Sequence, residues 1–171
     1  LDLLVIPIVK GEPYYYSYII VSSDSNITSL SDLKGKTFAF TDPLSNTGRL
    51  SPEYVIKQIG ESSSTFFKLT IFTYSHDKSI QAVAEGMVDG AAVDSLVWDY
   101  QLNNNPEFVS KTKIINISPK YGIPPIVASN NIDPVIREKI KNILLNIHED
   151  VEGRKILENL KVDRFSEPDD H

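Results

Sequence analysis

The residues best suited to binding a ligand fall in three short polar segments of the sequence. Residues 45–48 (Ser-Asn-Thr-Gly) combine two hydroxyls, an amide and a glycine, close ahead of a predicted helix. His76 lies in the first turn of a second predicted helix, and Asp94 begins a third. Hydroxyls and exposed N–H groups at a helix start favour an anion with several acceptor oxygens. A neutral His76 ring would add one N–H donor, and Asp94 would accept a hydrogen bond from a protonated ligand oxygen.

Each segment also has an ordinary structural explanation. Residues 45–48 fit a polar turn with a helix cap, His76 fits a partly exposed surface histidine, and Asp94 fits an N-cap aspartate. Residues 75–77 (Ser-His-Asp) are no hydrolase triad, because consecutive side chains cannot line up for proton relay. No further histidine or carboxylate completes a metal site with His76 and Asp94. Without that further ligand we expect no metal. Nucleotide-binding glycine motifs are absent as well, so we expect no cofactor.

The start of the helix after residue 48 is ambiguous in the sequence. Ser51-Pro52-Glu53 has the features of a helix N-terminus: a capping hydroxyl, proline at the first helical position and an acid in the first turn. That start lies beyond Gly48. Either residues 45–48 form a separate helical turn before a kink, or their donors belong to a loop.

All three segments follow a predicted strand and precede a predicted helix. In an open α/β sheet, ligands bind in loops at the carboxyl ends of the strands, so these segments are expected to converge. Strands and helices alternate along the chain, which predicts an α/β fold with a largely parallel sheet flanked by helices. The predicted strands span residues 3–9, 15–21, 37–41, 69–73, 90–93, 113–117 and 126–128, and the predicted helices span residues 51–60, 75–86, 94–102, 133–147 and 152–160.

Composition excludes several classes of protein. The chain has 171 residues, 41% of them hydrophobic, and a net charge of −6, which is typical of a globular domain and argues against nucleic-acid binding. Its longest apolar runs are far shorter than the roughly 20 residues of a membrane span. It has no cysteine, so disulfides, thiolate metal sites and cysteine nucleophiles are impossible. The chain starts at Leu1 without a signal sequence, and we expect it to be a piece of a longer protein.

Three segments together resemble the PhnD-like periplasmic substrate-binding proteins of ABC importers for phosphate, phosphite and phosphonates. DLKGKTFAFTDPLSNTGRLSP resembles the phosphate-loop region of that family, and YSHDKSIQAVAEGMVDGAAVDS resembles the segment that follows it. YYYSYIIVSSDSNITSL resembles the family's hinge strand. The resemblance covers most of residues 10–165 and implies a two-lobed type II periplasmic-binding-protein fold, in which a ligand closes the lobes by a hinge motion.

The resemblance implies a site and a division of the chain. The implied ligand-binding residues are Ser45, Asn46, Thr47, Gly48, His76, Asp94 and Tyr16. Asn46 replaces the commoner serine or threonine, Tyr16 matches a hinge-strand tyrosine that faces the cleft, and Asp94 falls at or near a position that varies in the family. Alternation along the strand places Tyr14, Tyr16 and Tyr18 on one face, and simple packing of that face is the other explanation.

The implied domain boundaries leave one of the two lobes, the first, incomplete. Residues 1–20 would be the hinge strand and a remnant of the first lobe, residues 21–115 the complete ligand-binding lobe, and residues 116–171 the return strand and C-terminal helices of the first lobe. The family normally has about 80–100 further residues before the position of Leu1. The strand at residues 3–9 and the helix at residues 136–147 would then lack their usual partners, unless rearrangement, a second copy of the chain (a homodimer) or a shortened lobe covers them.

Two departures from the family narrow the ligand. Members that bind aminoalkylphosphonates are expected to hold the amine with acidic residues, but this chain has Leu96 at one such position and Ile123-Pro124-Pro125 at the other. We therefore expect phosphate, phosphite or a small alkylphosphonate.

The predicted function is a periplasmic or extracytoplasmic solute-binding module, not an enzyme. Its partner would be a membrane permease of an ABC importer, or a membrane-bound histidine kinase if the chain is a sensor domain. An effector-binding domain of a transcriptional regulator with the same fold is the alternative, but it would need a helix-turn-helix segment upstream. An enzyme that has borrowed the fold ranks third, because no base and nucleophile are paired at credible spacing.

Overall fold

The structure is a computed structural model that describes residues 1–168. The chain divides into two compact units: unit 2 comprises Tyr15–Lys120, and unit 1 comprises Leu1–Tyr14 together with the segment from Tyr121 onward. Unit 2 begins before the expected boundary at residue 21, because Ser17–Ser22 is a strand of its sheet. That unit 2 is the ligand-binding lobe stays a prediction.

Unit 2 is built on a five-stranded sheet with the order β5-β4-β6-β3-β7. The strands are β3 (Ser17–Ser22), β4 (Thr37–Phe40), β5 (Leu69–Phe72), β6 (Gly90–Asp94) and β7 (Thr112–Ile117). Strand β4 pairs in parallel with β5 and β6, whereas β3 is antiparallel to both β6 and β7. Four strands therefore run in one direction and β3 runs against them, which confirms the predicted largely parallel sheet.

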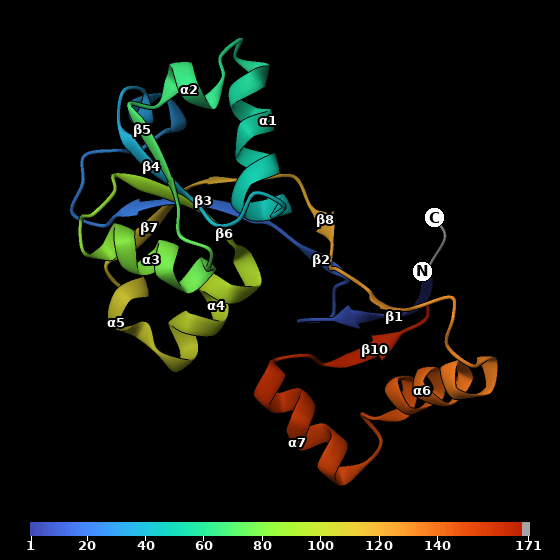
Figure 1. Ribbon diagram of the computed structural model, residues 1–171. Coiled ribbons are helices and arrows are strands. Elements are labelled where there is room, and N and C mark those ends of the chain that lie inside the picture. Colours follow the sequence, from blue (N-terminus) through green and yellow to red (C-terminus); the bar gives the residue numbers. More distant parts are fainter. Residues whose placement is uncertain (169–171) are drawn as a thin grey trace. The chain divides into compact units, whose positions relative to one another are not determined.

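Helices cover both faces of this sheet, as Figure 1 shows. The helical segments of unit 2 are η1 (Leu30–Leu33), η2 (Asn46–Leu50), α1 (Ser51–Gln58), α2 (Ser63–Phe66), α3 (His76–Ala84), α4 (Ser95–Asn104) and α5 (Pro106–Val109). Ile56 of α1 and Phe66 of α2 pack in the core on one face, whereas Ile80 of α3 and Val109 of α5 pack in the core on the other. Unit 2 is thus a three-layer α/β/α sandwich.

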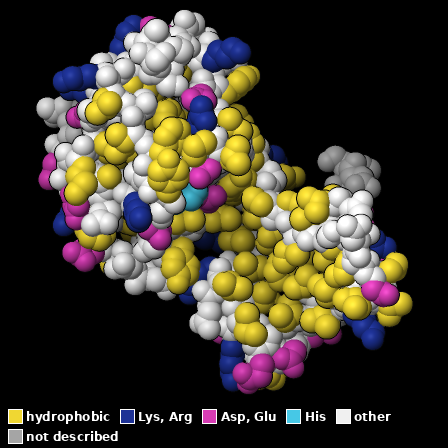
Figure 2. Space-filling view, viewed as in Figure 1, with side chains coloured by type: hydrophobic (Ala, Val, Ile, Leu, Met, Phe, Trp, Pro, Cys, Tyr) yellow, Lys and Arg dark blue, Asp and Glu magenta, His cyan; other side chains and the backbone are white. Residues whose placement is uncertain are grey.

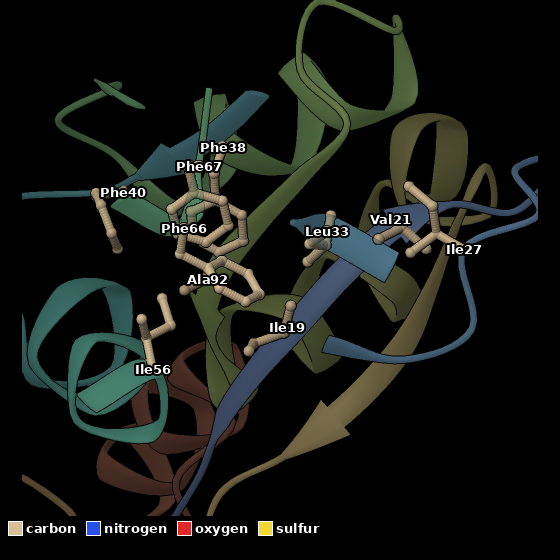
Figure 3. Close-up of a cluster of buried hydrophobic side chains, with 10 residues drawn as sticks. All are labelled: Ile19, Val21, Ile27, Leu33, Phe38, Phe40, Ile56, Phe66, Phe67 and Ala92. Carbon is tan, nitrogen blue, oxygen red and sulfur yellow. The ribbon is translucent and has the colours of Figure 1, made fainter. Parts of the chain in front are cut away.

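Strand alternation explains both cores. Phe38 and Phe40 of β4 point to the face covered by α1 and α2, and Ala39 between them points to the other face. Figure 3 shows the first of these clusters, where Phe38 and Phe67 stack with ring centroids 4.3 Å apart. On that second face, Ala39 packs in one cluster with Ile80 and Val83 of α3.

The structure corrects several sequence-based expectations in unit 2. The predicted strand at residues 15–21 is interrupted at Tyr16: β2 (Tyr14–Tyr15) pairs with β8 (Tyr121–Gly122), and β3 starts at Ser17. Helix α3 ends at Ala84, before the predicted end at residue 86. The short helices α2 and α5 were not predicted, because four-residue helices carry too little periodicity to be recognised in a sequence.

Helix α1 also differs from its prediction. Ser51 is not its N-cap, because η2 runs directly into it and the preceding Leu50 already has helical backbone angles. Tyr54 and Ile59 are exposed, and Ile56 is fully buried.

Unit 1 contains a three-stranded antiparallel sheet with the order β10-β1-β9. Its elements are β1 (Asp2–Ile8), β9 (Ile126–Ala128), α6 (Pro134–Asn146), α7 (Val151–Leu160) and β10 (Arg164–Ser166), the last of which was not predicted. Pro7 lies near the end of the central strand, where β1 pairs with β10 and the register with β9 has already finished at Val5.

The core of unit 1 is small. Its buried residues are Leu4, Val5, Ala128, Leu157 and Phe165. Helix α6 has no fully buried residue, and hydrophobic side chains gather around α6 and α7 on the face shown in Figure 2. Within residues 1–168, no helix is long and apolar enough to cross a membrane.

Candidate ligand-binding site

The turn at residues 45–48 is the start of a helix. Asn46–Leu50 form η2, a single turn of π-helix, closed by a hydrogen bond from the Leu50 N–H to the Ser45 carbonyl at 3.1 Å. The Ser45 hydroxyl caps this turn by accepting the Gly48 N–H at 2.9 Å. The amides of Asn46 and Thr47 precede the first helical hydrogen bond, so they are available to an anion. Residues 45–48 thus form a helical turn rather than a loop, but this turn continues directly into α1 instead of standing apart from it.

Gly48 lets this turn lie against the end of β4. A Cβ atom at Gly48 would come within 1.6 Å of the Thr41 Oγ1 atom and 2.7 Å of the Thr41 Cβ atom. The Thr41 N–H also donates to the Gly48 carbonyl at 3.2 Å. The glycine is therefore required by close approach to β4, rather than by a left-handed backbone angle.

Two residues of the β2–β3 segment hold the same turn. The Ser17 hydroxyl donates to the Thr47 carbonyl at 2.6 Å, and the Asn46 side-chain amide donates to the Tyr15 hydroxyl at 3.3 Å. Sequence reasoning missed Ser17. Its signal was a lone serine inside the otherwise apolar and aromatic run YYYSYIIV, because a buried hydroxyl needs a partner.

His76 is held in one tautomer by a backbone hydrogen bond. The Asp94 N–H donates to His76 Nδ1 at 3.0 Å, so Nδ1 is the acceptor and the ring proton lies on Nε2. Burial lowers the pKa of His76, although the nearby Asp94 and Asp77 carboxylates oppose that shift. The ring is therefore neutral near pH 7, with one N–H to donate.

Asp94 caps α4 and lies next to both other segments. One of its carboxylate oxygens accepts the Leu96 N–H at 2.8 Å, which confirms the N-cap prediction. The Thr47 hydroxyl and the Val97 N–H donate to the same carboxylate, and His76 lies close enough to influence its pKa. Burial raises the pKa of Asp94, and these hydrogen bonds partly offset the rise. Thr47, His76 and Asp94 therefore form one cluster.

Tyr16 joins the cluster through the start of α4. The Tyr16 N–H donates to the Ser95 hydroxyl at 2.9 Å, and the Ser95 N–H donates to the Tyr16 carbonyl at 3.0 Å. Ser95 was also missed by sequence reasoning. Tyr16 itself is 36% exposed, in agreement with a side chain that faces away from the core. All seven expected residues lie in unit 2.

This arrangement provides neutral hydrogen-bond donors and one carboxylate. Among residues 1–168, no group of three or more histidine, aspartate or glutamate residues is placed to hold a metal ion. The nearest cation in sequence, Arg49, bonds Glu53 at 3.2 Å and the Pro43 carbonyl at 3.0 Å, with its guanidinium over the Phe72 ring. Such a donor set suits hydrogen-bond recognition of an oxyanion rather than covalent chemistry.

Comparison with known proteins identifies the family. Residues 1–171 match the family described as "ABC transporter, phosphonate, periplasmic substrate-binding protein". The chain belongs to this family. It is 33% identical over 151 residues to the probable ABC transporter phosphite binding protein PhnD1 of Prochlorococcus marinus, covering 85% of this chain and 51% of that protein. It is also 33% identical over 154 residues to the phosphonates-binding periplasmic protein of Escherichia coli, covering 88% and 45%. The chain thus spans about half the length of the curated relatives it matches.

Solved structures of this family confirm the fold. The binding protein component of an ABC phosphonate transporter from Pseudomonas aeruginosa superposes with a TM-score of 0.90 at 29% identity, covering 98% of this chain and 57% of that one. PhnD1 from Prochlorococcus marinus in complex with methylphosphonate gives a TM-score of 0.86 at 27% identity, covering 99% and 66%. These matches confirm the predicted α/β fold of the periplasmic-binding-protein type.

Family membership also bears on function and place. The phosphonate-binding family consists of periplasmic substrate-binding components and not of enzymes. This agrees with the predicted periplasmic location and with the prediction of a binding protein rather than an enzyme. The relatives named above are transporter components, so the sensor-kinase and regulator alternatives gain no support from them.

Proposed function

We propose that this chain is the ligand-binding module of a periplasmic substrate-binding protein that captures a phosphonate-like oxyanion for an ABC importer. The ligand class comprises phosphate, phosphite and small alkylphosphonates. The residues proposed to bind it are Ser45, Asn46, Thr47, Gly48, His76, Asp94 and Tyr16. The membrane partner is proposed to be the permease of that importer.

The hydrogen bond from the Asp94 N–H to His76 Nδ1 carries this proposal. It leaves a fixed Nε2–H donor in the same cluster as the backbone amide of Thr47, whose hydroxyl donates to the Asp94 carboxylate. Donors of this kind bind phosphonyl oxygens without a metal or an arginine. Among the relatives, PhnD1 is described as a phosphite binding protein and has been solved with methylphosphonate, which supports the same ligand class here.

The residues expected to hold a ligand amine argue against aminoalkylphosphonates. Leu96 offers only its backbone N–H, which the Asp94 carboxylate accepts. The other expected position, Ile123-Pro124-Pro125, has no carboxylate either. An ammonium group taken out of water without an acidic partner is strongly unfavourable. We therefore expect methylphosphonate to bind more tightly than aminoethylphosphonate.

Titration of the 171-residue chain followed by amide NMR tests the proposal, because chemical shifts report weak binding as well as tight binding. Phosphate, phosphite, methylphosphonate and aminoethylphosphonate are each added up to millimolar concentration. At least one of the first three is expected to shift the amides of Thr47, Gly48, His76 and Asp94 in a saturable manner. Sodium chloride at matched ionic strength is the control. Spectra unchanged by all four ligands would overturn the proposed ligand class.

A further inference from the structure

One buried hydroxyl beside the candidate site has no group to which it can donate. Thr41 directly follows β4 and is 2% exposed. Its Oγ1 atom has no hydrogen-bond partner among residues 1–168. A buried polar group without a partner is uncommon and unfavourable, because burial removes its hydrogen bonds to water and nothing replaces them. The chain's own contacts therefore do not account for a hydroxyl at this position.

The backbone of Thr41 joins two of the segments that carry the site. Its carbonyl accepts the Tyr74 N–H at 2.6 Å, two residues ahead of His76. Its N–H donates to the Gly48 carbonyl at 3.2 Å, in the turn that begins η2. Thr41 is thus held from both sides at the base of this turn, with its hydroxyl beneath the backbone of η2.

The Ser45 hydroxyl borders the same space. A Cβ atom at Gly48 would meet both the Thr41 Oγ1 atom and the Ser45 Oγ atom, the latter at 2.9 Å. Within the described part of the chain, the Ser45 hydroxyl makes one hydrogen bond, which it accepts from the Gly48 N–H at 2.9 Å. A serine hydroxyl has one proton and two acceptor positions. The proton and one acceptor position of Ser45 are therefore unused.

A bound oxyanion would make Ser45 a better partner for Thr41. Ser45 is partly exposed and Thr41 is buried, so Ser45 is the one of the two whose hydroxyl can reach a ligand oxygen. A hydroxyl that donates a hydrogen bond becomes a stronger acceptor, because neighbouring hydrogen bonds polarise one another. With its proton directed to the ligand, Ser45 still has one acceptor position for the proton of Thr41.

We propose, on the basis of the function proposed above, that Thr41 is a positioning residue of the site. Its hydroxyl donates to Ser45 Oγ when Ser45 donates to an oxygen of the phosphonate-like ligand. A chain of two hydrogen bonds then runs from the end of β4 to the ligand. The hydrogen bond that Thr41 lacks within the chain is formed on binding, so it contributes to affinity and orients the Ser45 hydroxyl.

Two substitutions at Thr41 isolate the contribution of its hydroxyl. Thr41→Ser keeps the hydroxyl and Thr41→Ala removes it, and both remove the same methyl group. Valine is unsuitable, because it would put a methyl group in the place of the oxygen that lies against Gly48. Methylphosphonate affinity is measured by amide NMR titration of the 171-residue chain. Thr41→Ala is expected to bind at least about fivefold more weakly than Thr41→Ser, which is the equivalent of one net hydrogen bond.

Stability distinguishes this positioning role from a structural one. Without ligand, Thr41→Ser and Thr41→Ala are expected to unfold at the same urea concentration, because the Thr41 hydroxyl has no partner within the chain. Thr112 is the matched control, since its buried hydroxyl accepts the Trp98 Nε1–H at 3.2 Å and donates to the Val109 carbonyl at 2.9 Å. Thr112→Ala is expected to unfold at a lower urea concentration than Thr112→Ser, with equal affinity for methylphosphonate.

Removal of the Ser45 hydroxyl tests the path of the effect. In a Ser45→Ala background, Thr41→Ser and Thr41→Ala are expected to bind methylphosphonate equally, because Thr41 acts on the ligand through Ser45. A difference between them that persists in this background would contradict the proposed chain of hydrogen bonds.

The outcomes distinguish this inference from the function on which it rests. Equal affinity of Thr41→Ser and Thr41→Ala for methylphosphonate, or a serine variant that is the more stable one without ligand, would contradict the inference and leave the ligand class standing. Absence of binding of phosphate, phosphite and methylphosphonate to the parent chain would instead contradict the proposed function.

Discussion

A single backbone hydrogen bond at His76 determines what that residue offers to a ligand. Because the Asp94 N–H occupies Nδ1, the ring presents Nε2–H and cannot act as a base there. The same residue Asp94 uses its carboxylate to accept from Leu96 and Thr47. Thr47 is 2% exposed and its hydroxyl donates to Asp94. A ligand that reaches this hydroxyl must therefore share its proton with that carboxylate.

Removing either donor is expected to weaken ligand binding. His76→Ala and Thr47→Ala should each reduce the affinity for methylphosphonate by about 1–3 kcal/mol, the usual cost of a lost hydrogen bond to a charged group. This corresponds to roughly a 5- to 150-fold increase in Kd, measured by calorimetry. The control is Ser110→Ala, whose exposed hydroxyl bonds the Glu107 carbonyl far along the chain from the site. Parent-like affinity in both site variants would show that the ligand does not use this cluster.

Sequence reasoning found part of this cluster. It expected residues 45–48, His76 and Asp94 to converge, because each follows a strand and precedes a helix, and Thr47, His76 and Asp94 do lie together. It did not find the tautomer of His76, because a backbone donor from β6 leaves no side-chain signature. The family resemblance, rather than spacing, supplied Tyr16.

At the scale of elements, the contact between η2 and the end of β4 positions the start of α1. Gly48 lies against Thr41, and the Ser17 hydroxyl binds the Thr47 carbonyl from β3. The sequence favoured a helix start at Ser51, since Ser-Pro-Glu satisfies the rules for an N-terminus. The π-helical turn ahead of it could not be predicted, because it depends on tertiary contacts with β3 and β4.

Gly48→Ala is expected to destabilise this turn. The added methyl group would meet the Thr41 side chain at 1.6 Å, which forces η2 away from β4. Overpacking of this kind costs about 1–3 kcal/mol or more. The free energy of unfolding in urea should fall by at least that amount, and the affinity for methylphosphonate should fall with it.

A matched glycine tests whether space, rather than glycine flexibility, is responsible. At Gly122 an added Cβ atom would meet nothing within 4 Å, so Gly122→Ala should leave stability and affinity close to those of the parent. Thr41→Gly combined with Gly48→Ala removes the two closest opposing atoms and leaves the Ser45 Oγ atom at 2.9 Å, so it should recover part of the affinity lost by Gly48→Ala alone. An unaltered Gly48→Ala protein would contradict the role assigned to this contact.

At the scale of the whole molecule, the two units have unequal cores. Unit 2 has two buried clusters on the two faces of its sheet, whereas unit 1 has one small cluster under β1, β9 and β10. Helix α6 illustrates the difference. The sequence predicts a helix over residues 133–147 and Asp133 does cap it, yet none of its residues is fully buried. Periodicity predicts which face a helix offers, but not whether the rest of the chain covers it.

This inequality predicts different local stabilities. Burial of apolar surface is the main favourable contribution to folding, and segments with few buried contacts open at lower free energy. Amide hydrogen exchange should therefore be faster in α6 than in β3, β4 and β6 by at least about tenfold, or ~1.4 kcal/mol of opening free energy. Helix α7, which buries Leu157, should exchange at an intermediate rate. Uniform protection across α6 and the central strands would mean that unit 1 is stabilised by something other than its own core. The proposed contacts of methylphosphonate lie in unit 2, so the ligand should leave the exchange of α6 unchanged.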